Sequence, residues 1–313
     1  MKWVLLLVVI VFSACNGDQP TVKAVGTDTV WVGRDDDQIK QEDSLIKYGH
    51  ALISNTSYYL GPKGRVASIT NGMNCQNCHL DGGRIPFSNN YGAVASTYPK
   101  FRDRSGGIEN IQKRINDCIE RSLNGKALDT NSIEMKAILA YMHWLGDEVP
   151  KGVKPKGSGI MDLPYLDRAA DSSKGRLVFT KTCIVCHGAN GAGVKNPDGY
   201  GYTYPPIWGE NSYNTGAGLF RISRFAGYVK NSMPFGQVDY KHTLLSDEEA
   251  WDVAAFVNSM PRPGMDLSKD WPNISKKPVD HPFGPYTDGF SEHQHKYGPF
   301  EPIKEKAKSM ATK

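Results

Sequence analysis

Apolar residues recur three or four positions apart in three stretches of the chain, at 109–124, 132–145 and 246–260. This spacing places them on one face of an α-helix. Ser132 and Ser246 stand just before the apolar positions of the second and third stretches, and each is followed within three residues by glutamate, which is typical of a helix N-terminus. The pattern therefore predicts a mainly α-helical chain.

Two shorter helices are predicted at 44–52 and 172–179, and each leads toward a pair of cysteines. The two halves thus have a similar order of elements, which predicts a diverged tandem repeat joined by a Pro- and Gly-rich linker. The tail shows little periodicity and is expected to wrap around the domains. The predicted division of the chain is 1–14 signal peptide, 15–43 tether, 44–149 first domain, 150–171 linker, 172–265 second domain and 266–313 loop-rich C-terminal extension.

The composition suits a folded, loop-rich protein. Of 313 residues, 39% are hydrophobic and 22% charged, which argues against a disordered chain. Gly (32 residues) and Pro (19 residues) are frequent, which argues against a single long bundle or a coiled coil. The net charge of +4 is too small to indicate nucleic-acid binding, so no such partner is expected.

The N-terminus has the pattern of a secretory signal. Lys2 is followed by a nine-residue apolar run, Val4–Phe12, and then by Ser13, Ala14 and Cys15. A membrane span needs about 20 apolar residues, so this run predicts export. The small residues before Cys15 favour a lipoprotein signal, with Cys15 as a lipid anchor on the periplasmic side of a bacterial membrane. The alternative is an ordinary signal peptide that contains a cysteine.

Four of the six cysteines form two Cys-x-x-Cys-His motifs. The residues are Cys75, Cys78 and His79, then Cys183, Cys186 and His187. This pattern attaches a c-type haem, because two thiols bond one porphyrin and the histidine binds its iron. Zinc ribbons pair their motifs about 15–20 residues apart, whereas these begin 108 residues apart, and a thioredoxin-like motif would be single. The motifs therefore predict two covalently bound haems, one in each domain.

The second domain offers several candidates for the sixth iron ligand. Met233 is favoured because it lies in the loop before the last helix, 46 residues after the motif histidine. Lys230 and His242 are rival ligands nearby. Met260 and Met265 come later and are expected to pack against other residues or to lie at the surface.

The first domain has no methionine in the matching loop, but Cys118 follows the motif histidine by 39 residues. The spacing favours Cys118 as the iron ligand opposite His79. A thiolate donates strongly to iron, so a His/Cys haem should have a lower potential than a His/Met haem, and electrons should run from the first haem to the second. The alternative is a buried structural cysteine, because free Cys behaves as a small hydrophobe.

Basic residues surround Cys118 on the helix predicted at 109–124. Arg114, Cys118 and Ser122 are four residues apart and share one face, and Arg104 approaches from the preceding loop. Arginine binds oxyanions through several donors, so the arrangement suits an anionic substrate. The alternative is that these arginines pair with nearby acids or with haem propionates.

The residues around Cys118 resemble a known family, the dihaem thiosulfate dehydrogenases. The similar segments include both haem motifs and extend over about residues 45–303. They are Tyr98-Pro99-x-Phe101-Arg102-x-Arg104, Arg114-Ile115-Asn116-x-Cys118-x-x-Arg121-Ser122-x-Asn124-Gly125-Lys126-x-Leu128, Glu134-Met135-Lys136, Asp270-Trp271-Pro272, Asp280-His281-Pro282-Phe283-Gly284-Pro285 and Gln294-His295.

The resemblance implies two class I-like cytochrome c domains, the first with a His/Cys haem. It implies oxidation of two thiosulfates to tetrathionate, with Cys118 in the sulfur chemistry and Arg104, Arg114 and Ser122 in contact with substrate. Electrons would pass to an external acceptor, such as a cytochrome c or a membrane redox protein. Two other functions stay open: a tetrathionate reductase using the same site, and a non-catalytic dihaem electron carrier.

One position departs from some members of that family, which have Lys directly before the distal Met and exchange the two as ligands. Here the position is Ser232, so no such exchange is expected, and Lys230 remains a candidate cation in a substrate channel. His281, His293 and His295 of the tail are expected either at the surface or as ligands.

Overall fold

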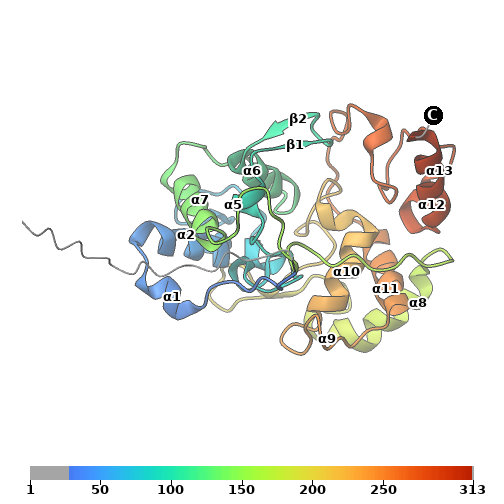
Figure 1. Cartoon of the computed structure of the whole chain (residues 1–313). Helices are drawn as coiled ribbons and strands as arrows, with labels where there is room; N and C mark the ends of the chain where they lie inside the picture. Colours follow the sequence, from blue (N-terminus) through green and yellow to red (C-terminus); the bar gives the residue numbers. More distant parts are fainter. Residues whose placement is uncertain (1–27, 312–313) are drawn as a thin grey trace, which may run out of the picture.

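The computed structural model describes residues 28–311 and contains two helical lobes, with a C-terminal extension beside the second (Figure 1). The signal sequence and the anchor predicted at Cys15 fall outside the described residues. Within 28–311, no helix combines the length and apolar character needed to cross a membrane.

Two long helices that pack on each other form the centre of the first lobe. α2 (Ser44–Ser54) begins after Asp43, whose carboxylate accepts hydrogen bonds from two amides of the first turn. α7 (Ile133–Leu145) begins after Ser132, whose hydroxyl accepts a hydrogen bond from the Met135 amide, as the sequence predicts. The other elements are α1 (Asp36–Gln41), α3 (Thr56–Leu60), η1 (Cys75–Asn77), α4 (Leu80–Gly83), α5 (Val94–Thr97), β1 (Lys100–Arg102), β2 (Gly107–Glu109) and α6 (Ile111–Arg121).

The second lobe repeats this plan with α8 (Ser172–Val178) and α11 (Asp247–Ser259). Ser246 and Glu249 form a reciprocal capping box at the start of α11, as predicted. α8 is capped by Asp171, whose carboxylate accepts hydrogen bonds from two amides of its first turn. The other elements are η2 (Phe179–Cys183, a π turn), α9 (Ile184–His187), β3 (Val194–Lys195), β4 (Tyr202–Tyr204), η3 (Gly218–Phe220) and α10 (Ile222–Ser232).

Glycine permits the same helix crossing in both lobes. A Cβ atom on Gly49 of α2 would lie 2.0 Å from the Ala137 carbonyl oxygen of α7. A Cβ atom on Gly175 of α8 would lie 1.8 Å from the Asp252 carbonyl oxygen of α11. No side chain fits at such distances, so each pair of helices meets backbone to backbone. The predicted tandem repeat is therefore visible in the packing itself.

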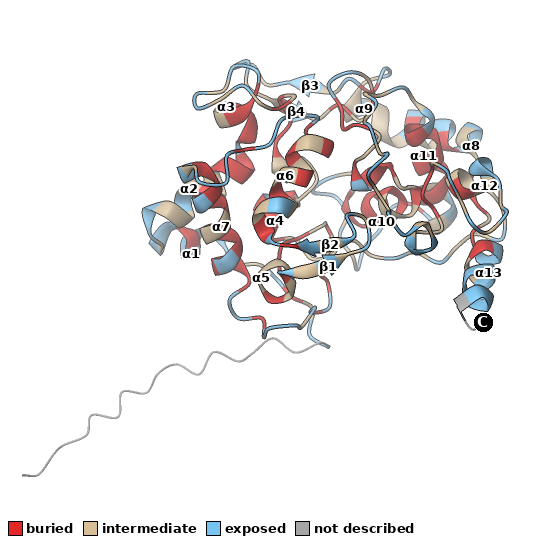
Figure 2. Cartoon of the chain, turned by 90° about the horizontal axis from the view of Figure 1, so that it is seen from above, coloured by how far each residue is buried: buried red, intermediate tan, exposed pale blue. Residues whose placement is uncertain are grey.

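Buried residues gather along α2, α7, α10 and α11 (Figure 2). Met135 and Met142 of α7 are buried in the first core, so both serve packing. In the second core the ring of Trp251 lies 5.6 Å from that of Phe300, which comes from the C-terminal extension. The extension therefore completes the core of the second lobe.

Three features differ from the sequence-based expectation. The antiparallel hairpin of β1 and β2 pairs Lys100 with Glu109, so α6 starts at Ile111 with Asn110 as its N-cap, two residues later than predicted. The helix ends at Arg121, before the expected Gly125. The extension also contains short helices that its pattern did not indicate. They are η4 (Ile274–Lys276), α12 (Glu292–Tyr297) and α13 (Glu301–Ala311).

The C-terminal extension connects both lobes (Figure 1). After α11 it reaches the β1–β2 turn, where the Trp271 amide donates to the Arg104 carbonyl oxygen at 2.7 Å. It then returns to the second lobe, where the Ala170 amide donates to the Tyr297 carbonyl oxygen at 2.8 Å. Its middle part thus lies over the region between the lobes.

Candidate active site

The first haem motif presents its histidine as a neutral ligand. His79 Nδ1 donates to the Asn89 carbonyl oxygen at 2.5 Å, and the ring stacks on Tyr91. Burial lowers the pKa of His79 to about 4. With Nδ1–H committed to a carbonyl, the lone pair is on Nε2, where the Asn89 side-chain amide lies 3.4 Å away. This is the tautomer that a haem iron requires.

The second motif repeats this arrangement. His187 Nδ1 donates to the Pro205 carbonyl oxygen at 2.9 Å, and burial lowers the pKa of His187. Cys183 ends the π turn, a feature often found at functional sites. The four motif cysteines are free thiols, and burial raises the pKa of Cys75 and of Cys183 to about 11. Two free thiols next to a neutral histidine fit the pattern that attaches a haem covalently and binds its iron.

Cys118 of α6 lies beside the first motif, although 39 residues separate it from His79. Burial raises the pKa of Cys78 most, and a negative charge on Cys118 raises it further. It is the largest influence that raises the pKa of Arg114, one helical turn before it. The structure therefore brings together the remaining thiol, the motif thiols and an arginine.

The arginines around Cys118 differ in their partners. Arg104 forms an ion pair with the buried Asp117 at 2.5 Å, and Lys113 shares that carboxylate. Arg121 forms a two-pronged pair with Asp270 of the C-terminal extension. The alternative of pairing with a nearby acid is therefore correct for Arg104, whereas Arg121 pairs with an acid that is distant in sequence and was not predicted.

The guanidinium group of Arg114 has no hydrogen bond and no ion pair with any residue in 28–311, and the residue is partly buried. The six basic side chains of this cluster face four acidic ones, which leaves a net charge of +2. They are Arg102, Arg104, Lys113, Arg114, Arg121 and Arg221 against Glu109, Asp117, Asp270 and Asp280. The surplus suits an anion, and Arg114 is the free donor that would meet it.

A cavity of about 120 Å³ opens beside Arg114, between the two lobes and the C-terminal extension. Arg104 and Arg114, two of the predicted substrate contacts, are in its wall. Ser122, the third, caps α6 and is not part of this wall. The full lining is Arg102, Arg104, Arg114, Thr215, Gly216, Ala217, Gly218, Phe220, Arg221, Leu267, Asp270, Trp271, His281 and Pro282.

Sequence reasoning missed the contribution of Arg221, Trp271 and His281 to this wall. They stand more than 100 residues after Arg114, and no local pattern links them to it. His281 and His295 are buried and only His293 is exposed, so the surface expectation is wrong for two of the three histidines.

The surroundings of the second motif favour one of the candidate ligands. Lys230 donates to the Leu245 carbonyl oxygen at 2.6 Å and pairs with Asp247 at 2.8 Å, so its ammonium group is already engaged. It is therefore not a free cation for a substrate channel. The side chain of His242 is 83% exposed. Met233, directly after α10, is partly buried and packs against the core.

The two lobes touch at the first haem motif and beside it. Tyr228 of α10 donates its hydroxyl hydrogen to the Asn77 carbonyl oxygen, inside the first motif, at 2.9 Å. The hydroxyls of Ser88 and Ser232 lie 2.9 Å apart, one from each lobe. Since Met233 follows Ser232 directly, the predicted ligand of the second haem is attached to a helix that contacts the first motif.

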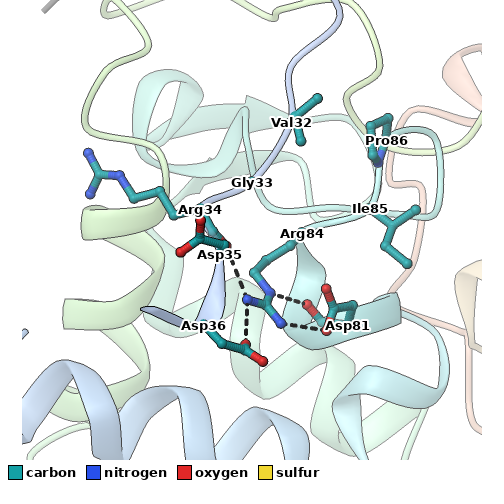
Figure 3. A pocket seen from close by; sticks show the side chains of 9 residues that line it. All are labelled: Val32, Gly33, Arg34, Asp35, Asp36, Asp81, Arg84, Ile85 and Pro86. Carbon is teal, nitrogen blue, oxygen red and sulfur yellow. Dashed lines mark hydrogen bonds and ion pairs between the residues drawn. The ribbon is translucent and has the colours of Figure 1, made fainter. Parts of the chain in front are cut away.

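A second, more open pocket lies on the first lobe around Arg84 (Figure 3). Arg84 pairs with Asp81 and Asp36 and also donates to the Arg34 carbonyl oxygen. Arg34 in turn pairs with Asp147. The charges of this pocket therefore satisfy one another, and they fasten the N-terminal segment to the turn after the first motif.

Two lobes of this kind, each with one Cys-x-x-Cys-His motif, define a dihaem c-type cytochrome. Residues 66–150 match the profile "SoxA/TsdA, cytochrome c domain" and residues 172–261 match the profile "Cytochrome c". The chain belongs to the thiosulfate dehydrogenase family. Its two cytochrome c domains carry one c-type haem each, as the motifs predicted.

The relatives are similar over most of their lengths. The thiosulfate dehydrogenase of Psychrobacter arcticus is 40% identical over 81% of this chain and 76% of its own. That of Allochromatium vinosum is 42% identical over 62% of this chain and 72% of its own. The as-isolated thiosulfate dehydrogenase (TsdBA) of Marichromatium purpuratum has a similar structure, with a TM-score of 0.68 and 26% identity over 86% of this chain. This chain spans 54% of that longer one.

Proposed function

We propose that the chain is a thiosulfate dehydrogenase that joins two thiosulfates into tetrathionate and releases two electrons. The observation that carries the proposal is the placement of Cys118 and the unpaired Arg114 beside the first haem motif. A thiol that no haem attachment uses, next to a free guanidinium group, suits chemistry on a sulfur oxyanion. The relatives named thiosulfate dehydrogenase support the same reaction class.

We assign His79 and Cys118 as the ligands of the first iron, and His187 and Met233 as those of the second. When bound, each haem takes up one electron, so the pair supplies the two-electron sink that the reaction needs. The contact between Tyr228 and the first motif supports a short path between the haems.

The protein's task is to bring two dianions together. Their mutual repulsion opposes the reaction, and fixed cationic groups in a partly dehydrated site offset it. Arg114 can bind the first thiosulfate with its unpaired donors. Arg104 contributes positive potential while it stays paired with Asp117, whose carboxylate also holds Lys113. The net charge of +2 in the cluster matches one thiosulfate.

Cys118 can carry one thiosulfate as a covalent adduct. For this, Cys118 would first have to leave the iron; a sulfur–sulfur bond would then form between its thiolate and the outer sulfur of thiosulfate, with loss of two electrons that the two haems, when bound, would accept. The second thiosulfate then attacks that outer sulfur. A new sulfur–sulfur bond forms, the bond to Cys118 breaks, and tetrathionate departs while Cys118 returns to its thiolate. Charge and electrons balance in both steps, and no proton is needed.

The test adds thiosulfate to the oxidised holoprotein with an electron acceptor and measures tetrathionate. Wild type should form it, and Cys118→Gly should not. Gln112→Ala, on the same helix, serves as the control and should stay active. A wild type that forms no tetrathionate, or an equally active Cys118→Gly variant, would contradict the proposal. Mass spectrometry of the Cys118 peptide should also show added sulfur after incubation with thiosulfate.

The unpaired Arg114 favours an enzyme over a simple electron carrier, because a carrier has no need of a free cation beside its haem. The reverse reaction, tetrathionate reduction, would use the same residues. Supplying reduced protein with tetrathionate and following its reoxidation compares the two directions in one preparation.

The remaining proposals concern the setting of the enzyme. We assign the first domain to residues 44–149 and the second to 172–265, with an external cytochrome c or membrane redox protein as acceptor. We also propose a lipid anchor at Cys15 on the periplasmic side. Cys15→Ala should release the protein from membranes, and recovery of the variant in the membrane fraction would refute the anchor.

A further inference from the structure

His281 is the one histidine in the wall of the cavity, and histidine is the side chain whose ordinary pKa lies nearest to neutral pH. It comes from the C-terminal extension, which has no role in the proposed reaction so far. Its side chain is 8% exposed. The inference below rests on the proposed function, because it concerns how the same cavity binds the anionic substrate.

The ring of His281 is held in one orientation. Nδ1 lies 3.1 Å from the Phe283 carbonyl oxygen, and this contact is shorter than the 3.4 Å approach of the Phe283 amide. An Nδ1–H donating to the carbonyl is therefore the favoured form. The ring also packs edge-on against Trp271 at 5.8 Å. Phe283 is outside the cavity wall, so Nε2, at the opposite edge of the ring, is the atom left for the cavity.

Nε2 of His281 has no hydrogen-bond partner among residues 28–311. Nε2 is not fully buried, so this unpartnered nitrogen is accessible to a ligand that enters the positively charged cavity. A neutral ring offers only a lone pair there, which would repel an anion. A protonated ring would offer a donor.

The charge balance of the reaction also favours a protonated His281. Two thiosulfates bring four negative charges into a cluster whose net charge is +2 with His281 neutral. One further positive charge next to the anions would lower their repulsion at the moment they meet. His281 is placed to supply it.

We propose that His281 is a substrate-binding residue that takes up one proton when an oxyanion enters the cavity, so that Nε2–H donates to the anion. In the empty cavity the ring is neutral. Burial, with help from the cations Lys277 and Arg221, lowers its pKa to about 4. An anion beside Nε2 acts in the opposite direction and stabilises the imidazolium form.

The groups that face His281 are mostly cationic. Those of its own segment are Lys277 and Asp280, and the hydroxyl of Tyr286 donates to its carbonyl oxygen. Those of the cavity wall are Arg102, Arg104, Arg114, Arg221 and Asp270. The two nearest acids are engaged, Asp280 by Arg221 and Asp270 by Arg121. Glu109 is the rival proton acceptor, because its buried carboxylate has no hydrogen bond in the part of the chain described.

The consequence is a pH-dependent affinity. Above about pH 4, and up to the pKa that His281 has with the anion bound, binding of the dianion is coupled to uptake of one proton. Affinity should therefore rise as the pH falls, by up to about tenfold per pH unit, and level off below about pH 4. Thiosulfate itself stays a dianion over this range, so the slope reports the protein.

The experiment measures thiosulfate binding to fully reduced holoprotein, which cannot oxidise it. Titration calorimetry in two buffers of different ionisation enthalpy gives the number of protons taken up. Wild type should take up close to one proton near pH 6, and His281→Gln none, with an affinity that no longer depends on pH. His293→Gln, an exposed histidine of α12, is the matched control and should behave as wild type.

Each outcome supports or contradicts the proposed role of His281. If His281→Gln, with a normal haem spectrum, still takes up the proton, the inference is wrong, and loss of uptake in Glu109→Gln would identify Glu109 instead. Proton-linked binding without tetrathionate formation by the oxidised wild type would refute the proposed function and leave the inference standing. Tetrathionate formation together with thiosulfate binding that does not depend on pH would support the proposed function and refute the inference about His281.

Discussion

Arg121 of α6 and Asp270 of the C-terminal extension form a two-pronged ion pair, with nitrogen–oxygen distances of 2.7 and 2.8 Å. Both side chains are 11% exposed. The pair joins the helix that bears Cys118 to a segment that begins in the other lobe. The pair thereby fixes α6, on one side of the cavity, to the C-terminal extension on the adjacent side. The two residues are 149 positions apart in the sequence.

Breaking this pair should destabilise the protein strongly. Asp270→Asn leaves the Arg121 charge nearly buried and without its counter-ion, which should cost about 3–5 kcal/mol of unfolding free energy. Denaturant unfolding of the holoprotein measures it. Glu301→Gln, which removes an exposed pair with Lys304 on the same extension, should cost at most about 0.5 kcal/mol. Equal effects of the two substitutions would contradict this account.

Arg114 and Arg104 should respond differently to the same substitution. Arg114→Gln removes the unpaired donor, so we expect kcat/KM for thiosulfate to fall by about 100-fold with little loss of stability. Arg104→Gln breaks an ion pair with Asp117, so it should cost about 2 kcal/mol of unfolding free energy as well.

Steady-state kinetics and thermal unfolding separate these two effects. Arg176→Gln, at an exposed position of α8, is the control and should change neither. If Arg114→Gln lowers stability and leaves kcat/KM intact, Arg114 has a structural role instead.

These contrasts show what sequence could and could not predict. Helices 133–145 and 247–259 were predictable because their caps, Ser132 and Ser246, are local signals next to a clear apolar period. The haem motifs were equally visible, because their chemistry lies within five consecutive residues. The β1–β2 hairpin was missed because three-residue strands carry too little periodicity.

The cavity could be predicted only in part. Arg104 and Arg114 were found because they lie close to Cys118 in sequence. The sequence alone did not show which of the two arginines was paired. Asp117 lies one turn from Arg114, but in the structure its carboxylate pairs with Arg104. His281 and Trp271 enter the same wall through the path of the C-terminal extension, and only tertiary structure reveals that path.

Asp280 should make stability depend on acid. Burial alone would raise its pKa, but Arg221 and Ser223 bind both carboxylate oxygens and hold the pKa below its ordinary value. The carboxylate is therefore stabilising above about pH 4, and this contribution is lost as the pH falls through the lowered pKa. Asp280→Asn should cost about 3 kcal/mol at neutral pH.

The difference between wild type and Asp280→Asn should shrink as the pH falls below about 4, because the wild-type carboxyl group then becomes neutral too. Denaturant unfolding at neutral and acidic pH measures this. A difference that stays constant with pH would show that Asp280 acts through shape and not through charge.

Met233 should set the potential of the second haem. Replacing it by alanine removes the thioether proposed as the iron ligand, and since a His/Met pair raises the potential, the variant's second haem should have a lower one. Redox titration measures both haems, and loss of the absorption band between methionine sulfur and ferric iron reports the ligand itself.

Met260→Leu removes the rival thioether at the end of α11 and should leave the potential and the absorption band unchanged. Because Lys230 is held by Asp247 and the Leu245 carbonyl oxygen, it is not expected to replace Met233 in the variant. A potential that falls in Met260→Leu and not in Met233→Ala would reverse the assignment and move the ligand from the loop after α10 to the end of α11.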